Sequence, residues 1–223
     1  MSAGAGAAAL DGPRVPPASG GPAKKLVVFL HGYGADGSDL IPLADPLSRV
    51  LPDAAFVSPD APAPCREAPT GRQWFDLTLR DPDEYVRGVT AAMPALSRFL
   101  AEECARHGLG GADLALVGFS QGTMMALATG LAGPVSPRGI VGFSGLLALP
   151  DSAGPDAVTA TSVLLVHGTE DELLPAGLTI AAATRLAALG CPVEWHLRPG
   201  LGHGIDPGGL DMAADYLAKL FPP

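Results

Sequence analysis

The stretch LALVGFSQGTMMALA, residues 114–128, places one serine between two glycines at the junction of two apolar segments. The first segment, residues 114–119, is short and apolar and follows a glycine pair, so it predicts a buried strand. The second, from Gln121 to about Leu131, is rich in alanine, leucine and methionine and predicts a helix. A chain that passes from strand to helix within two residues needs little side-chain bulk, and the two glycines meet that need.

This arrangement matches the G-x-S-x-G nucleophile elbow, in which a strained turn presents the serine hydroxyl at the edge of a sheet. Ser120 is therefore a candidate nucleophile. The alternative is a glycine-flanked turn whose serine caps the following helix. With 29 glycines in 223 residues, the pattern arises by chance about 0.2 times. The strand-before, helix-after context favours the elbow, and the decision rests on the partners that a serine nucleophile needs.

Composition limits the classes of function. The length of 223 residues and the hydrophobic content of 48% suit one globular domain with a sizeable core. A net charge of −9 argues against binding to nucleic acid or to an anionic membrane surface. No apolar run is long enough to span a bilayer. Cys65, Cys104 and Cys191 show neither metal-site spacing nor a disulfide framework, so we expect no metal, no other cofactor and a cytoplasmic location.

Residues 1–22 are dominated by alanine, glycine, proline and serine and predict a flexible lead-in to a single domain at residues 23–223. The segment lacks a basic region ahead of its small residues, so we do not expect a signal peptide. Within it, residues 10–12 are candidates for pairing at a sheet edge.

Strands alternate with helices along the rest of the chain. We expect strands at residues 26–30, 54–58, 114–119, 139–143, 162–166 and 193–197, and helices at residues 39–51, 83–107, 121–131, 176–189 and 208–220. Residues 59–82 hold five prolines and predict a long surface loop. The alternation predicts an α/β fold, a mostly parallel sheet with helices on both faces and no separate lid domain. Sites in such sheets lie at the carboxyl ends of the strands.

In the hydrolase version of this fold, an acid and then a histidine follow the serine along the chain. His203, in the glycine-rich loop GLGHGID past a strand end, is the favoured general base. His167 and His196 lie within or at the end of predicted strands, where histidines are more often structural. The acid is expected in HGTEDELLP, after the strand that ends at residue 166. We prefer Asp171, although the sequence scarcely separates it from Glu170.

An acyl-transfer site also needs donors for the oxyanion. One is the backbone N–H of Gln121, at a helix N-terminus where the helix dipole helps. The other is expected in the loop LHGYGADGSD, residues 30–39, with the Tyr33 N–H as the candidate. His31 in the same loop is expected to be a hydrogen-bonded anchor.

Five motifs, FLHGYGADGSDL, GRQWFDL, GFSQG, HGTEDELLP and GLGHGID, occur in the order and at roughly the spacing of the phospholipase/carboxylesterase family of small α/β-hydrolases. That family includes acyl-protein thioesterases, and the chain resembles it from about Leu26 to Leu220. The resemblance implies the α/β-hydrolase fold. It also implies a nucleophile, an acid, a base and two oxyanion donors at Ser120, Asp171, His203, Tyr33 and Gln121, respectively.

The resemblance extends to the substrate pocket. Trp74 falls in the family's Trp-Phe-Asp stretch near the acyl site, although ordinary aromatic packing explains it equally well. The segment SGLLALP, residues 144–150, resembles an apolar loop beside the pocket, so Leu146, Leu147 and Leu149 are expected to wall an open groove. Thr123 stands where the family's thioesterases have a second glycine, which favours a small-ester hydrolase of bacterial type.

We therefore expect a serine carboxylesterase that hydrolyses short-to-medium acyl esters through an acyl-enzyme intermediate. An acyl thioesterase or lysophospholipase with the same residues is the alternative enzyme, and a non-catalytic binding module is the alternative outside enzymes. The expected partner is a small-molecule ester or thioester, with no nucleic acid and no stable membrane insertion. The sequence leaves open whether the protein forms a homodimer.

Overall fold

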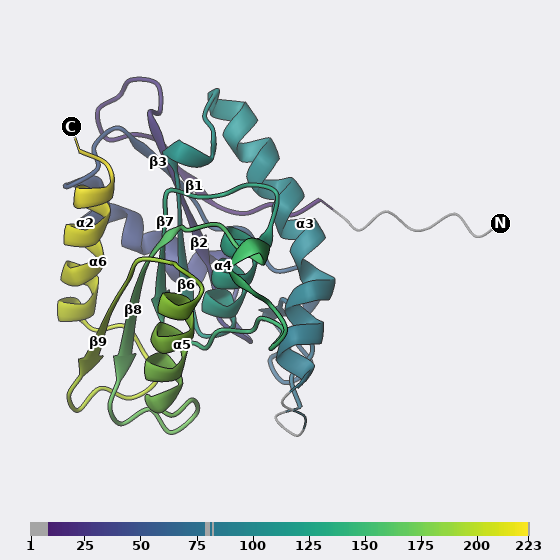
Figure 1. Cartoon of the computed structure of the whole chain (residues 1–223). Helices are drawn as coiled ribbons and strands as arrows, with labels where there is room; N and C mark the ends of the chain where they lie inside the picture. Colours follow the sequence, from purple (N-terminus) through teal and green to yellow (C-terminus); the bar gives the residue numbers. More distant parts are fainter. Residues whose placement is uncertain (1–8, 79–80, 82, 223) are drawn as a thin grey trace.

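A computed structural model describes residues 9–78, 81 and 83–222 of the chain. Its centre is a seven-stranded sheet in the order β1-β3-β2-β6-β7-β8-β9 (Figure 1). β1 pairs antiparallel with β3, and all the other neighbours are parallel. The strands of this sheet are β1 Arg14–Val15, β2 Lys25–Leu30, β3 Ala54–Val57, β6 Leu114–Phe119, β7 Gly139–Phe143, β8 Ser162–Gly168 and β9 Val193–Arg198.

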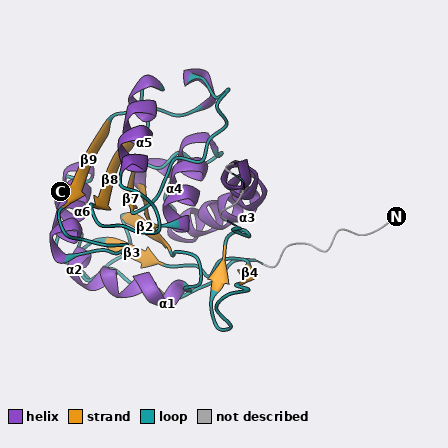
Figure 2. Cartoon of the chain, turned by 90° about the horizontal axis from the view of Figure 1, so that it is seen from below, coloured by secondary structure: helices purple, strands orange, loops and turns teal. Residues whose placement is uncertain are grey.

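Helices cover both faces of the sheet, as Figure 2 shows from below. One face carries α3 Asp83–His107, α4 Gln121–Ala132 and α5 Gly177–Ala188, and the other carries α1 Gly37–Leu40, α2 Ala44–Ser48 and α6 Pro207–Leu220. Three 3₁₀ turns complete the helical segments: η1 Ile41–Leu43, η2 Gly111–Asp113 and η3 Pro155–Ala157. The mostly parallel α/β architecture is confirmed, and so are all six predicted strands, to within two residues at their ends.

Alternate residues of the central strands face the two helical layers. In β2, Val28 and Leu30 pack with α3 and α4, whereas Val27 and Phe29 pack with α1, α2 and α6. Because both faces are covered, the strand is apolar at every position from Leu26 to Leu30 rather than at every second one. β6, β8 and β9 end at the same edge of the sheet, so the loops after them, which carry Ser120 and the predicted acid and base, meet there.

The single helix predicted at residues 39–51 is wrong. The chain forms three short segments there, α1, η1 and α2, which end at Ser48. Pro42 and Pro46 both lack the N–H that would donate to the carbonyl four residues earlier, and two such interruptions four residues apart favour short segments over one continuous helix.

The predicted boundary at residue 23 is also wrong. β1 lies inside the expected lead-in, and further hydrogen bonds join it to the chain after β3, from Ser58 N–H to the Pro13 carbonyl and from Asp60 N–H to the Asp11 carbonyl. The predicted edge pairing of residues 10–12 thus occurs at Asp11 and continues through β1. Residues 1–8 of the lead-in lie outside the described residues.

The segment 59–82 is only partly the surface loop that its prolines predict. β4 Ala63–Pro64 and β5 Arg72–Gln73 form a small antiparallel hairpin within it. The Arg72 guanidinium donates to the carbonyl oxygens of Ala61 and Pro62, directly before β4, which holds the two arms of the hairpin together. Residues 79, 80 and 82 of this segment lie outside the described residues.

Among the residues that the structure describes, no helix is both long enough and apolar enough to cross a bilayer.

A partly buried ion pair fastens β1 to α3. Arg14 Nη2 and Nε lie 2.7 and 3.2 Å from the two carboxylate oxygens of Glu103, whose side chain is 2% exposed. Arg106 Nε lies 3.1 Å from the same carboxylate. Burial alone raises the pKa of Glu103, but the hydrogen bonds and charges of the two arginines outweigh it, so the pKa lies below its ordinary 4.5.

Arg14→Ala is expected to lower the free energy of unfolding by about 2 kcal/mol. It removes the arginine that makes two of the three hydrogen bonds to the buried Glu103 carboxylate, while Arg106 remains. Because folding lowers the pKa of Glu103, this contribution is present above its ordinary pKa and is lost as pH falls through the folded value. Urea unfolding at neutral and acid pH measures both effects. Arg49→Ala is the control, because Arg49 and Asp45 form an exposed pair whose loss should cost less than about 0.5 kcal/mol.

Candidate active site

Ser120 occupies the turn between β6 and α4 with backbone angles that side chains seldom adopt, φ 54° and ψ −117°. Its amide N–H donates to the Phe143 carbonyl at the end of β7, 2.9 Å away. A Cβ atom on Gly122 would stand 1.8 Å from the Leu30 carbonyl oxygen, and one on Gly118 would stand 2.4 Å from the Gly122 carbonyl oxygen. The turn therefore requires both glycines, and the strand and helix predicted on either side of it are confirmed.

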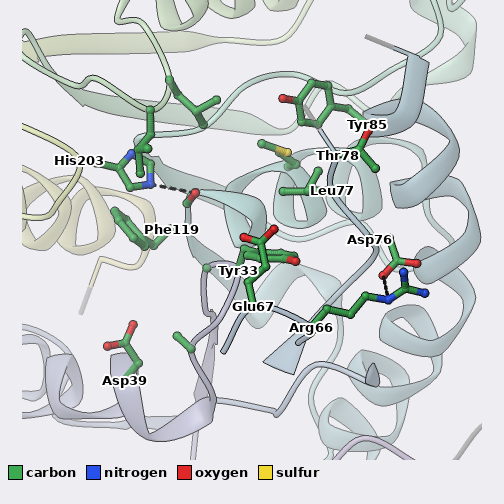
Figure 3. A pocket seen from close by; sticks show the side chains of 16 residues that line it. Tyr33, Asp39, Arg66, Glu67, Asp76, Leu77, Thr78, Tyr85, Phe119 and His203 are labelled. Atoms are coloured by element: carbon green, nitrogen blue, oxygen red, sulfur yellow. Dashed lines mark hydrogen bonds and ion pairs between the residues drawn. The ribbon is translucent and has the colours of Figure 1, made fainter. Parts of the chain in front are cut away.

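Two further side chains, those of His203 and Asp171, form a hydrogen-bonded series with the Ser120 hydroxyl. His203 lies in the loop between β9 and α6, and its Nε2 atom is 3.0 Å from Ser120 Oγ (Figure 3). Its Nδ1 atom is 2.7 Å from Oδ2 of Asp171, which follows β8. Because a carboxylate only accepts hydrogen bonds, Nδ1 carries the proton and Nε2 is left to accept from the serine.

Asp171 is the buried member of three adjacent acidic residues, and Glu170 and Glu172 are exposed. Asp171 Oδ1 accepts the amide N–H groups of Leu173 and Leu174, each at 2.9 Å. Burial by itself raises the pKa of this carboxyl, but the two amides and the nearby imidazole outweigh it and hold the pKa below its ordinary 3.8. Asp171 therefore stays ionised at neutral pH.

The turn that carries Tyr33 follows β2 and packs against Ser120, since a Cβ atom on Gly32 would stand 3.3 Å from Ser120 Cβ. The Gly34 amide N–H donates to the Arg72 carbonyl in β5, 2.9 Å away. The β4–β5 hairpin thus fixes the backbone on which the predicted Tyr33 donor lies.

His31 confirms its predicted role as an anchor of this turn. The Ala61 amide N–H donates to His31 Nε2 at 3.0 Å, and His31 Nδ1 lies 2.8 Å from the Gly32 carbonyl oxygen. Burial lowers the pKa of His31, which favours the neutral ring that these two contacts need.

Gln121 is the first residue of α4, so its backbone N–H has no partner within the helix. Its buried side chain reaches the segment after β5: Oε1 accepts from the Trp74 amide N–H at 2.9 Å, and Nε2 donates to the Phe75 carbonyl at 2.8 Å. The Trp74 indole N–H donates to the His31 carbonyl at 3.0 Å. One buried tryptophan therefore links the two segments that carry the predicted oxyanion donors.

A cavity of about 720 Å³ opens beside Ser120 and His203 (Figure 3). The Phe119 ring packs against the His203 ring with centroids 4.9 Å apart. An exposed Arg66–Asp76 pair, 3.8 Å apart, lies on the opposite side of the cavity in Figure 3. The lining residues are Gly32, Tyr33, Ala35, Asp39, Arg66, Glu67, Asp76, Leu77, Thr78, Tyr85, Phe119, Ser120, Met124, Leu173, Leu174 and His203.

The sequence and structure agree with a known enzyme family. The family model described as Phospholipase/Carboxylesterase matches residues 14–221. The chain belongs to the phospholipase/carboxylesterase family. It is accordingly a carboxylic-ester hydrolase with the α/β-hydrolase fold, as the motifs predicted.

The chain is similar to proteins that are named as esterases and to others that are named as thioesterases. The chain is 32% identical to esterase YpfH of Escherichia coli over 90% of this chain and 85% of that protein. It is 30% identical to acyl-protein thioesterase 1 of Gibberella zeae over 88% of this chain and 91% of that protein. The crystal structure of esterase PE8 matches with a TM-score of 0.91 and 43% identity, over 96% of this chain and all of that one.

The leucines predicted to wall the pocket do not line this cavity. Leu146, Leu147 and Leu149 line a second cavity of about 740 Å³, beside the start of α3. The Arg185 guanidinium on α5 donates to the carbonyls of Leu149 and Pro150, which fastens the end of their loop to α5 beside this second cavity. Within the described part of the chain, Tyr85 is the residue that lines both cavities.

Trp74 is likewise not among the lining residues. Its side chain is 3% exposed and packs in the core beneath α3 and α4. The sequence allowed two interpretations of Trp74, a place near the acyl site or ordinary aromatic packing. The structure agrees with aromatic packing, which the indole hydrogen bond to the His31 carbonyl completes.

Several residues that line the cavity were not predicted from the sequence. Met124 follows Ser120 by four positions on α4, so helical spacing places it on the face that bears the serine. Leu173 and Leu174 come directly after the acidic run in HGTEDELLP, and their place in the wall follows from the position of that loop. Leu77 ends the motif GRQWFDL, which could have pointed to it, whereas the sequence carries no signal for Tyr85.

Thr123, which departs from the thioesterase pattern, lies beneath the elbow rather than in the cavity. Its Oγ1 atom is 2.8 Å from the carbonyl oxygens of both Gly118 and Phe143, at the ends of β6 and β7. The hydroxyl thus ties together the two strand ends between which Ser120 is held.

Proposed function

We propose that Ser120, His203 and Asp171 act as nucleophile, general base and orienting acid in the hydrolysis of carboxylic esters with short-to-medium acyl chains. One observation carries the proposal. Contacts of 2.7 and 3.0 Å run without a break from Asp171 through His203 to Ser120, at the wall of an open cavity. Membership of the phospholipase/carboxylesterase family supports this reaction class.

In the first half of the reaction, His203 Nε2 takes the proton of Ser120 as Oγ attacks the ester carbonyl carbon. The tetrahedral intermediate collapses when its C–O bond to the alcohol breaks, and the imidazolium gives its proton to the departing oxygen. In the second half, His203 takes a proton from water, whose oxygen attacks the acyl-enzyme. Release of the acid returns the proton to Ser120 Oγ.

The backbone N–H groups of Tyr33 and Gln121 would stabilise the negative oxygen of both tetrahedral intermediates. The Gln121 N–H lies at the start of α4, where the helix dipole is positive. The buried link through Trp74 supports the proposal, because donors act most strongly when their positions are fixed in advance.

The cavity wall indicates an uncharged, apolar substrate. Leu77, Leu173, Leu174 and Met124 give it an apolar part that suits an acyl chain. Asp39, Glu67 and Asp76 outnumber Arg66 in the same wall, so an ester with a carboxylate or phosphate close to the scissile bond would be repelled.

The rate should rise steeply from acetyl to butyryl or hexanoyl p-nitrophenyl esters and then level off or fall. Each methylene buried against the apolar wall is worth about 0.8 kcal/mol, or about fourfold in kcat/KM, until the chain outgrows the cavity. The rate should show no jump where the substrate begins to form micelles. A profile that is highest at acetyl, or a sharp jump at the micelle concentration, would contradict the proposed open apolar cavity.

A pair of variants tests which wall holds the acyl chain. Leu77→Trp fills the cavity beside Ser120 and should move the optimum to shorter esters. Leu147→Trp enlarges the same residue type in the second cavity and should leave the profile unchanged. If Leu147→Trp moved the acyl-chain optimum and Leu77→Trp did not, the acyl chain would bind against the leucines predicted from the sequence.

The thioesterase alternative has its own support in the similarity to acyl-protein thioesterase 1 of Gibberella zeae. Matched oxygen esters and thioesters of one acyl chain separate the two activities through their kcat/KM values. A non-catalytic binding module would fail to react with a fluorophosphonate probe, whereas the proposed enzyme should be labelled at Ser120.

We further propose a cytoplasmic location, which fits three buried thiols without disulfides.

A further inference from the structure

His167 is a fully buried histidine that the proposed mechanism does not use. It lies near the end of β8, four residues before Asp171. Its Nε2 atom is 2.8 Å from the Leu174 carbonyl oxygen, and its Nδ1 atom is 2.7 Å from Oγ1 of Thr179 on α5. Because a carbonyl oxygen only accepts, Nε2 carries a proton, and the Thr179 hydroxyl forms the hydrogen bond with Nδ1.

The same N–H edge of His167 faces the candidate acid. His167 Nε2 lies 3.1 Å from Asp171 Oδ2, the oxygen that meets His203 Nδ1 at 2.7 Å. Leu174 closes the arrangement, since its carbonyl accepts from His167 while its amide N–H donates to Asp171 Oδ1. Both side chains are inaccessible to solvent, so water does not weaken these contacts.

We propose that His167, with Thr179 behind it, is a positioning residue that holds the Asp171 carboxylate in the orientation in which Oδ2 meets His203. This inference rests on the proposed function, in which Asp171 orients the base. His167 touches neither the cavity nor Ser120, so it acts only through the acid and the loop that carries it. A misplacement of about 1 Å in a catalytic group can cost about 100-fold in rate.

Kinetics of His167→Leu test the proposal in two backgrounds. In the wild-type background, kcat should fall about 100-fold while KM changes by less than about threefold, because no wall residue has changed. In an Asp171→Ala background, the same substitution should cause no further loss, because the group through which His167 acts is already gone. Thermal unfolding of each variant gives the folded fraction to which every rate is normalised.

Conservative variants separate positioning from simple packing. His167→Gln keeps an N–H donor near the position of Nε2 and should recover most of the lost rate. Thr179→Val keeps the volume but removes the hydroxyl, and kcat should fall about tenfold, whereas Thr179→Ser should match the wild type. His196→Gln is the control for the substitution itself, since His196 pairs with Glu194 at the exposed edge strand and should keep full activity.

Two outcomes would overturn the inference: folded His167→Leu with wild-type kcat, or an equal loss in the wild-type and Asp171→Ala backgrounds. If His167→Leu does not fold, wild-type kcat in folded Thr179→Val overturns it instead. Failure of the proposed function has a different signature. Ser120→Ala or Asp171→Ala would then keep near-normal activity, whatever the effect of changes at His167.

Discussion

Replacement of Ser120 by alanine is expected to lower kcat for ester hydrolysis by about 10⁶ and to abolish labelling by a fluorophosphonate probe. The Oγ atom is the group that His203 Nε2 contacts at 3.0 Å, and alanine leaves nothing to form the acyl-enzyme. The fold should be unaffected, since the strained backbone accommodates an even smaller side chain more easily. Hydrolysis of p-nitrophenyl butyrate, with thermal unfolding as a check, measures both.

Ser144→Ala is the matched control for this change. Ser144 is a second buried serine with positive φ (47°) close to the site, and its Oγ lies 3.5 Å from the Gly204 carbonyl oxygen rather than against the imidazole. Its replacement should leave kcat within about tenfold of the wild type. A Ser120→Ala enzyme that kept even a tenth of the normal rate would remove Ser120 from the mechanism.

Asp171→Asn is expected to lower kcat by about 10⁴. The Leu173 and Leu174 amides donate to Oδ1, so the asparagine carbonyl should occupy that side and its NH₂ should face His203 Nδ1. The imidazole would then carry its proton on Nε2, the atom that must accept from Ser120. Steady-state kinetics with one short ester measure the loss.

Glu170→Gln and Glu172→Gln make the same chemical change on either side of Asp171. Both side chains are exposed, and both variants should stay within about threefold of the wild type. A larger loss in Glu170→Gln than in Asp171→Asn would assign the acid to Glu170, the choice that the sequence left open.

Local sequence patterns predicted the elements that local physics controls. An apolar segment, a glycine-framed serine and an alanine-rich segment define the turn at Ser120, because backbone crowding within a few residues decides its shape. The break in the helix at residues 37–48 also has a local cause. Pro42 and Pro46 indicated it, but the apolar residues of the segment led to the prediction of one helix. The edge strand β1 carried a weaker signal, because its two residues are too few to show a period, and the sequence indicated only edge pairing of the preceding residues 10–12.

The walls of the site depended on contacts that no local pattern contains. Leu146 and Leu147 have the composition of a pocket wall, but Arg185 holds their loop over a different cavity. Leu77 and Leu173 line the cavity beside Ser120 although they are the least distinctive residues of the motifs GRQWFDL and HGTEDELLP. Which apolar residues face a substrate is decided by how separate loops pack, since any of them could be buried equally well elsewhere.

The sequence by itself determined the fold class, the nucleophile candidate and the order of serine, acid and histidine, because strand–helix alternation and glycine spacing are short-range constraints on the backbone. Only the tertiary structure showed that Asp171 is buried between two exposed acidic neighbours and brought His167 and His203 to the same carboxylate. Adjacent carboxylates are chemically alike along a chain. They differ only when folding buries one of them among hydrogen-bond donors from distant segments and leaves the others in water.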